Sequence, residues 1–178
     1  MKTLGVCWRV ARSARALHFL AALTCAAAPM LASAQHAACA AAERTLFGCS
    51  SGAKTIAICA SAALSATSGS LQYRFGRPGS PELAYPAAGA DWRAATRAGS
   101  LMFAGGGGAY LAFTNERYRY IVYSASGRGW GNKAGVVVER AGKRIASVAC
   151  KGPVASEIGP SLFSVAGIEA AEGEFDLP

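Results

Sequence analysis

Short runs of alternating apolar and polar residues, separated by turn-forming residues, constrain this chain more than any other feature. Alternation with a period of two places every second side chain on the same face of a strand. Ser51-Gly52, Arg77-Pro78-Gly79 and similar groups separate the runs. This pattern predicts an all-β fold, an antiparallel barrel or sandwich of about eight short strands. The eight predicted strands cover residues 44–49, 54–60, 70–75, 100–104, 109–114, 117–124, 134–140 and 143–150.

Residues 109–124 give the clearest hairpin pattern. A two-residue turn at Asn115-Glu116 would place Phe113 opposite Tyr118 and Leu111 opposite Tyr120. We expect the face with these aromatic and aliphatic side chains to be the core side. The other face would then carry Tyr110, Thr114, Arg117, Arg119 and Ile121.

A second hairpin is predicted around Ala141-Gly142. It would set Glu139 opposite Arg144 and Val138 opposite Ile145. A longer loop with Gly142 at a positive-φ position is the alternative. The register of this hairpin therefore stays open.

The first 34 residues have the composition of a bacterial secretory signal peptide. Four basic and no acidic residues precede or flank an apolar run from Ala16 to Leu31, which is followed by Ala32-Ser33-Ala34. A retained membrane anchor is the alternative, but the run is alanine-rich, interrupted by Pro29, and shorter than a typical bilayer span. We expect cleavage, a mature chain without a membrane span, and a periplasmic or secreted location.

Four cysteines remain after such cleavage: Cys39, Cys49, Cys59 and Cys150. In an exported domain they indicate two disulfides, for which three connectivities exist. We expect Cys49–Cys59 to close a local hairpin and Cys39–Cys150 to tie the N-terminal arm to a late strand. A zinc site is disfavoured because the spacing lacks a Cys-x-x-Cys clamp and only one histidine remains.

The charge pattern divides the mature chain. Residues 35–151 carry fourteen basic and five acidic side chains, whereas residues 152–178 carry five acidic side chains and no basic one. We expect an N-terminal arm at 35–43, a β domain at 44–151, and an acidic C-terminal segment at 152–178 that contains a short helix or loosely docked stretch and is partly disordered. A basic body indicates an anionic partner, or a tail that masks it.

Few residues in this chain could perform catalysis, and we expect no enzyme, no cofactor and no metal. The one histidine of the mature chain, His36, follows the cleavage point too closely to be held beside a nucleophile. Glu82 and Asp91 are the only conceivable carboxylate pair for a hydrolase. The run Gly105–Gly108 lacks the Gly-Lys-Ser/Thr end of a phosphate-binding loop.

Surface recognition is the function class that remains. Arginine together with aromatic side chains is typical of surfaces that bind anions, sugars or proteins. An ordinary basic β surface has the same composition. The candidate binding residues are Arg74, Arg77, Arg117, Arg119, Arg128 and Trp130.

Four stretches carry a resemblance to known proteins: Leu46–Cys49, Leu71–Gly79, Arg117–Tyr123 and Gly135–Glu139. They resemble small exported bacterial proteins of an uncharacterised family, over most of residues 44–150. The resemblance implies export and a β fold and brings no activity with it. In size, disulfides and strand content the chain is also similar to periplasmic lysozyme-inhibitor domains, although no stretch matches their inhibitory motif.

The expected function is therefore that of an exported, non-catalytic binding or structural protein of the cell envelope. Its basic face would recognise an anionic envelope polymer such as lipopolysaccharide or a peptidoglycan-linked polymer. A protein partner of the envelope or medium is the other possibility, and inhibition of a lysozyme-like hydrolase is the alternative function. Nucleic acid is not an expected partner because the signal peptide would export the chain.

Overall fold

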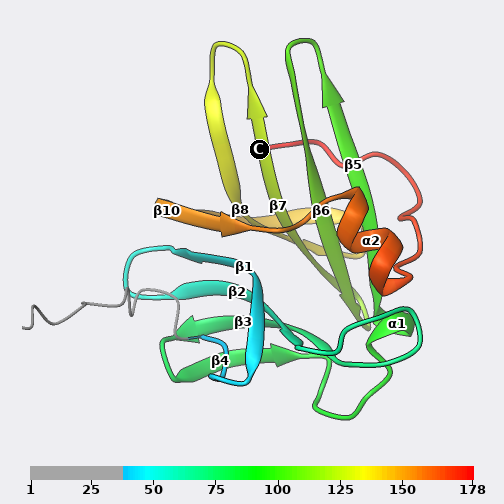
Figure 1. Ribbon diagram of the computed structural model, residues 1–178. Helices are drawn as coiled ribbons and strands as arrows, with labels where there is room; N and C mark the ends of the chain where they lie inside the picture. The colour runs from blue at the N-terminus through cyan, green and yellow to red at the C-terminus, as the bar shows by residue number, and fades with distance from the viewer. Residues whose placement is uncertain (1–37) are drawn as a thin grey trace, which may run out of the picture. The chain divides into compact units, whose positions relative to one another are not determined.

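The computed structural model describes residues 38–178, which form two five-stranded antiparallel sheets and two short helices (Figure 1). Sheet A has the order β10-β1-β2-β3-β4, and its strands are β1 (Glu43–Ser50), β2 (Thr55–Ser61), β3 (Leu71–Arg77), β4 (Ser80–Tyr85) and β10 (Lys151–Ser156). Sheet B is a simple meander of β5 (Thr96–Phe103), β6 (Gly106–Asn115), β7 (Tyr118–Gly127), β8 (Gly131–Arg140) and β9 (Lys143–Ala149). Helices α1 (Trp92–Ala95) and α2 (Pro160–Ala166) complete the fold. The predicted signal peptide at residues 1–34 lies outside the described residues, as do residues 35–37 of the predicted arm.

The main hydrophobic core lies between the two sheets, which confirms the all-β prediction and selects its sandwich form. Sheet A contributes buried side chains such as Phe47 and Ile58, and sheet B contributes Leu111, Phe113 and Val122 to the same cluster. All five are fully buried. Burial of apolar surface of this kind is the main stabilising contribution to a sandwich of two half-polar sheets.

Two of the ten strands were not predicted, and each contains a proline. Pro81 lies in β4 and Pro153 lies in β10. Proline cannot donate a ladder hydrogen bond, so its presence argues against a strand in the middle of a sheet. Both strands are at the edges of sheet A, where one side of the strand needs no partner. Strand β10 also runs past residue 151, where we expected the β domain to end.

The β6–β7 hairpin forms with a register two residues away from the expected one. Phe113 pairs with Tyr120 and Leu111 with Val122, so that the turn is formed by Glu116 and Arg117 rather than by Asn115 and Glu116. A shift of two residues leaves every side chain that stays in the strands on its predicted face, whereas Arg117 moves into the turn. Glu116 adopts the positive φ of 55° that this tight turn requires.

In the β8–β9 hairpin the predicted pairing of Glu139 with Arg144 is confirmed. Ala141 and Gly142 form a two-residue turn in which both have positive φ. A bulge after Val138 then shifts the register, so Val138 pairs with Ala146 and not with Ile145. The bulge could not be read from the alternation, which it interrupts by one residue.

Both disulfides are present, but the expected connectivity was wrong. Cys39 is bonded to Cys59 and Cys49 to Cys150, with Cα–Cα distances of 5.4 and 5.7 Å. The β1–β2 register places Thr45, not Cys49, opposite Cys59. Strand β10 pairs with β1 on its other side and begins directly after Cys150, which brings that residue to Cys49. The pairing thus follows from a strand that the sequence did not predict.

The outer face of sheet B is also covered, although we expected it to carry exposed polar residues. Tyr110, Ile121 and Tyr123 form a second buried cluster there with Phe175 of the C-terminal segment. The short helix expected in this segment is α2. The part beyond it, through Pro178, runs back over sheet B, and its expected partial disorder stays a prediction. Neither helix of residues 38–178 has the length and apolarity that crossing a bilayer would need.

The disulfide pairing can be checked by tryptic mapping of the unreduced protein. Arg44, Lys54, Arg74, Arg144 and Lys151 place each of the four cysteines on a separate tryptic peptide. We expect mass spectrometry to find the peptide ending at Arg44 joined to residues 55–74, and residues 45–54 joined to residues 145–151. A linked pair of 45–54 with 55–74 would contradict the observed fold of β10 beside β1.

Thr96 is the one fully buried side chain among the described residues whose hydroxyl has no hydrogen-bond partner there. A buried hydroxyl without a partner costs roughly 1–3 kcal/mol of desolvation. We therefore expect Thr96→Val to raise the free energy of unfolding by about 1 kcal/mol in urea denaturation. Thr45→Val, at a half-buried position of β1, serves as the matched control. A loss of stability in Thr96→Val would contradict this account.

Candidate binding surface

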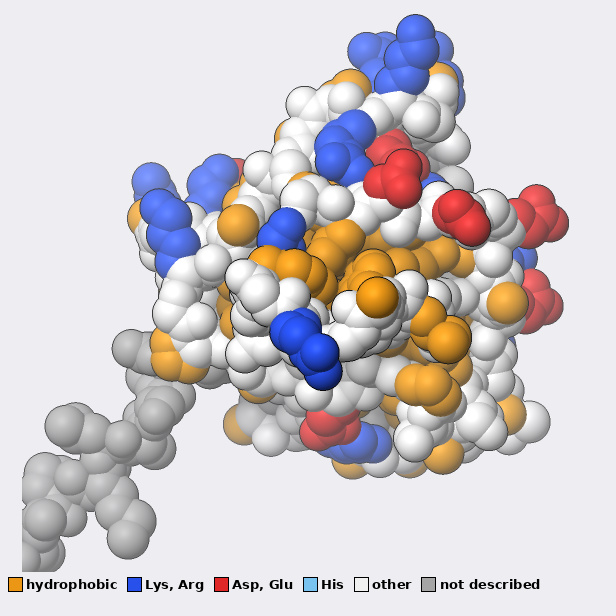
Figure 2. Space-filling model, turned by 90° about the horizontal axis from the view of Figure 1, so that it is seen from above, with side chains coloured by type: hydrophobic (Ala, Val, Ile, Leu, Met, Phe, Trp, Pro, Cys, Tyr) orange, Lys and Arg blue, Asp and Glu red, His pale blue; other side chains and the backbone are white. Residues whose placement is uncertain are grey.

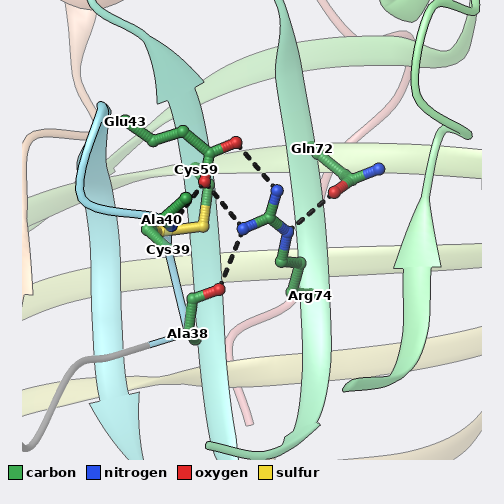
Figure 3. Close-up of a disulfide and its surroundings, with 7 residues drawn as sticks. All are labelled: Ala38, Cys39, Ala40, Glu43, Cys59, Gln72 and Arg74. Atoms are coloured by element: carbon green, nitrogen blue, oxygen red, sulfur yellow. Dashed lines mark hydrogen bonds and ion pairs between the residues drawn. A yellow bond between two sulfur atoms is a disulfide. The ribbon is translucent and has the colours of Figure 1, made fainter. Parts of the chain in front are cut away.

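Arg74, the first candidate binding residue, lies in a hydrogen-bonded network beside the Cys39–Cys59 disulfide (Figure 3). Its Nη1 and Nη2 atoms donate to the two carboxylate oxygens of Glu43 at 2.7 and 2.8 Å. Its Nε donates to Gln72 at 2.7 Å, and Nη1 also donates to the carbonyl of Ala38 at 2.9 Å. With its side chain only 17% exposed, Arg74 holds the N-terminal arm on sheet A and is not available to a ligand.

The same contacts set the ionisation of Glu43. Burial by itself would raise the pKa of this carboxyl, but the hydrogen bonds from Arg74 and from the Ala40 N–H, and the charge of Arg74, outweigh burial and hold the pKa below its usual 4.5. Glu43 therefore binds its proton less readily in the folded than in the unfolded chain. Its contribution to stability is present above the unfolded-state pKa and is lost as the pH falls through the lower, folded-state value.

We expect Glu43→Gln to lower the free energy of unfolding at pH 7 by about 2 kcal/mol, because Arg74 loses a charged, bidentate partner. The difference from the wild type should shrink as the pH falls below 4.5, where Glu43 itself becomes protonated. Urea denaturation between pH 7 and pH 3 measures both effects. In the matched control Glu82→Gln, the ion pair with Lys54 is half-exposed on both sides, and the loss should be about 0.5 kcal/mol or less. An equal loss in the two variants would show that the Glu43 network has no special role.

Arg77, Arg117 and Arg119 lie on different parts of the surface and do not form a common site. Arg77 is exposed at the end of β3 in sheet A. Arg119 lies on the outer face of sheet B, with Nη1 3.3 Å from Glu139 Oε2. Arg117 occupies the β6–β7 turn and not the strand face predicted for it. Arg117 and Arg128 flank the ten-residue strand β7, which at ~3.4 Å per residue separates them by roughly 30 Å.

Arg128 and Trp130 do come together, in the turn that connects β7 to β8. The meander places this turn beside the β5–β6 turn, and the Arg128 N–H donates to the Gly105 carbonyl at 3.1 Å. The Phe103 ring meets the Trp130 ring edge-on, with the centroids 5.7 Å apart. The Nζ atom of Lys133 is 5.4 Å from the Trp130 centroid. We call Phe103, Arg128, Trp130 and Lys133 the hairpin-tip cluster.

Gly127 leaves the space that the Trp130 ring occupies in this cluster. A Cβ atom at Gly127 would overlap the Trp130 indole, so only glycine lets the ring lie flat against the strand. Trp130 is nevertheless 38% exposed, and Arg128 and Lys133 are exposed. The sequence indicated Arg128 and Trp130 as binding residues but gave no sign that Phe103 lies beside them, because that contact depends on the alignment of two separate hairpins.

A cleft of about 510 Å³ lies next to the same hairpins. In Figure 1 the β5–β6 and β7–β8 hairpins extend past β10, and the cleft forms where the inner face of sheet B emerges beside that strand. Small polar groups line it, among them Ser124, Ser126, Asn132 and Ser156. Figure 2 shows hydrophobic side chains in a hollow of the face seen from above, with both basic and acidic side chains around its margins.

The residues considered for catalysis or metal binding have structural roles. Glu82 forms an ion pair with Lys54 at 2.6 Å, and the Asp91 side chain caps α1 by accepting the Arg93 N–H at 3.0 Å. Cys39, Cys59 and Glu43 are close enough together to suggest a metal site. The two sulfur atoms are bonded to each other and the carboxylate is bonded to Arg74, so this group offers no thiolate ligand to a metal.

Comparison with known proteins adds no further constraint, because the chain matches no family model, no curated protein sequence and no solved structure. The resemblance to small exported bacterial proteins accordingly stays a prediction, and the function has to be argued from the surface itself.

Proposed function

We propose that this protein is an exported, non-catalytic binding protein of the cell envelope that recognises an anionic envelope polymer. The observation that carries the proposal is the hairpin-tip cluster, in which an exposed tryptophan has Lys133 over its ring and the exposed Arg128 two positions before it in the same turn. Of the candidate residues, only Arg128 and Trp130 are brought together in an accessible position.

The chemistry of the cluster suits a charged polysaccharide. The indole face of Trp130 offers a flat apolar surface on which a sugar ring can lie, and its N–H can donate to a hydroxyl. Arg128 can form two parallel hydrogen bonds to a carboxylate or phosphate, and Lys133 adds a second positive charge. Phe103 supports the indole from the side, which restricts the ring to one orientation.

The adjacent cleft extends the surface that a polymer could follow. Its serine and asparagine side chains donate and accept hydrogen bonds, as sugar hydroxyls do. Lys133 is among the cleft-lining residues, but its side chain lies with Trp130 on the outer face of sheet B, whereas the cleft opens on the inner face. A polymer with repeated charges that passes over the hairpin tips can contact the cations on one face and the neutral polar groups of the cleft on the other.

Two features support a location outside the cytoplasm. Two disulfides fit an oxidising, non-cytoplasmic compartment. The basic, apolar and small-residue order of the first 34 residues supports export. Glu82 forms an ion pair and Asp91 caps α1, and these structural roles support the proposal of a non-catalytic protein.

The test is co-sedimentation of the mature protein with isolated sacculi and envelope fractions, at low and at physiological salt. We expect saturable binding that falls with salt, because the attraction is partly electrostatic. Trp130→Ala should lower the affinity about tenfold, since an aromatic contact contributes roughly 1 kcal/mol or more. Arg128→Glu should lower it further by replacing attraction with repulsion.

Arg117→Glu is the matched control, because it makes the same charge change at an exposed turn at the other end of β7. It should retain binding. If Arg117→Glu and Arg128→Glu weaken binding equally, only net charge matters and the hairpin-tip cluster is not the site. If the wild type does not sediment at either salt, an anionic polymer is the wrong ligand, and titration against lysozymes would test the inhibitor alternative.

A further inference from the structure

The C-terminal segment beyond α2 lies along the free edge and the outer face of sheet B. Ala170 forms a parallel bridge with Ala98 of the edge strand β5. The Ala98 N–H donates to the Glu169 carbonyl at 2.9 Å, and the Ala171 N–H donates to the Ala98 carbonyl at 2.8 Å. Glu169 also forms an ion pair with Arg97 at 3.0 Å. The segment thus begins by adding a short strand to the sheet, as extended peptides do at open edges.

Phe175 is the anchor of this segment. Its ring is 7% exposed and lies between those of Tyr110 and Tyr123, with centroids 5.1 and 5.8 Å away. Gly99 leaves space here, because a Cβ atom at that position would overlap the Tyr110 ring. The two tyrosines and this glycine form a slot on sheet B, which we call the aromatic slot.

Two cations hold the main chain that leaves the aromatic slot. Arg144 donates to the Asp176 carbonyl, and Lys133 donates to the Pro178 carbonyl at 2.7 Å. The side chains of Glu172, Glu174 and Asp176 form no ion pair with any residue in the part of the chain that the structure describes. The segment therefore contacts basic side chains through its main-chain carbonyls and through the ion pair of Glu169 with Arg97, and it carries one buried aromatic anchor.

The C-terminal segment makes fewer contacts with sheet B than a strand of the sheet makes with its neighbours. Two backbone hydrogen bonds join the segment to β5, and most of residues 167–174 are exposed. The five strands of sheet B form their ladders without it. Segments with few buried contacts open at lower free energy than the core of a domain.

We infer that the aromatic slot, with Arg97 and Arg144 beside it, is a docking site for an extended acidic peptide that carries an aromatic anchor, and that residues 169–177 occupy it as a tethered ligand. A partner with this chemistry would replace the tail, pair with the edge of β5 and place its aromatic ring between Tyr110 and Tyr123. The inference does not rest on the proposed polymer binding, whose residues lie at the hairpin tips.

The test uses the full mature chain and a fluorescein-labelled peptide with the sequence of residues 168–178. Phe175→Ala removes the anchor of the tethered tail and leaves the slot intact. We expect fluorescence anisotropy to show the peptide binding to Phe175→Ala at least about tenfold more tightly than to the wild type, where the tail competes at high effective concentration. A peptide with alanine in place of its phenylalanine should not bind.

Two further variants keep the result interpretable. Met102→Ala is the control, because Met102 is 91% exposed on β5 beside the slot, and it should behave as the wild type. Glu169→Ala breaks only the half-exposed ion pair with Arg97, so it should fold normally and give intermediate peptide binding. Absence of peptide binding to both a folded Phe175→Ala and Glu169→Ala would overturn the inference, as would equal binding to all variants. A wild-type dimer in analytical ultracentrifugation that Phe175→Ala abolishes would also overturn it, since the occupant would be the tail of a second copy.

Discussion

Cys150 is the residue on which the arrangement of the two sheets depends. It lies between the last strand of sheet B and the last strand of sheet A. Its N–H donates to the Ala134 carbonyl of sheet B at 2.9 Å, while its sulfur is bonded to the fully buried Cys49 of sheet A. This junction closes one side of the core and sets β10 against β1. The cleft beside the projecting hairpins exists because β10 crosses there and leaves the inner face of sheet B uncovered beyond it.

Sheet B is buried on both faces, and this explains where binding can occur. Sheet A packs on one face through Leu111, Phe113 and Val122, and the C-terminal segment packs on the other through Phe175. Because the middle of sheet B is covered on both faces, the surfaces it leaves open are its hairpin tips with the cleft beside them, its edges, and whatever displacement of the C-terminal segment would expose. The hairpin-tip cluster and the aromatic slot correspond to the first and the last of these. Lys133 belongs to the cluster and also contacts Pro178, so the proposed ligand at the tips would compete for one of the cations that hold the tail.

Local sequence patterns predicted the strands and their two faces better than they predicted which strands and side chains contact one another. The alternation placed Leu111 and Tyr110 on opposite faces correctly, even though the turn position was wrong, because a slip of two residues preserves the faces. Strands β4 and β10 were not predicted because they contain Pro81 and Pro153, and the sequence around a proline does not indicate whether its strand lies at the edge of a sheet. Arg74 was indistinguishable from Arg128 in the sequence. One is enclosed by Glu43 and Gln72, and the other is exposed beside Trp130.

By itself, the sequence determined an antiparallel β fold, two disulfides, a basic body and an acidic end, because alternation, cysteine number and charge depend only on the order of residues. The tertiary structure decided which cysteines pair, which arginines remain free and what covers sheet B. Each of these depends on contacts between segments far apart in the chain, such as Cys49 with Cys150, 101 positions apart, and Lys133 with Pro178. Such contacts arise from the register and stacking of whole sheets, which no local pattern encodes.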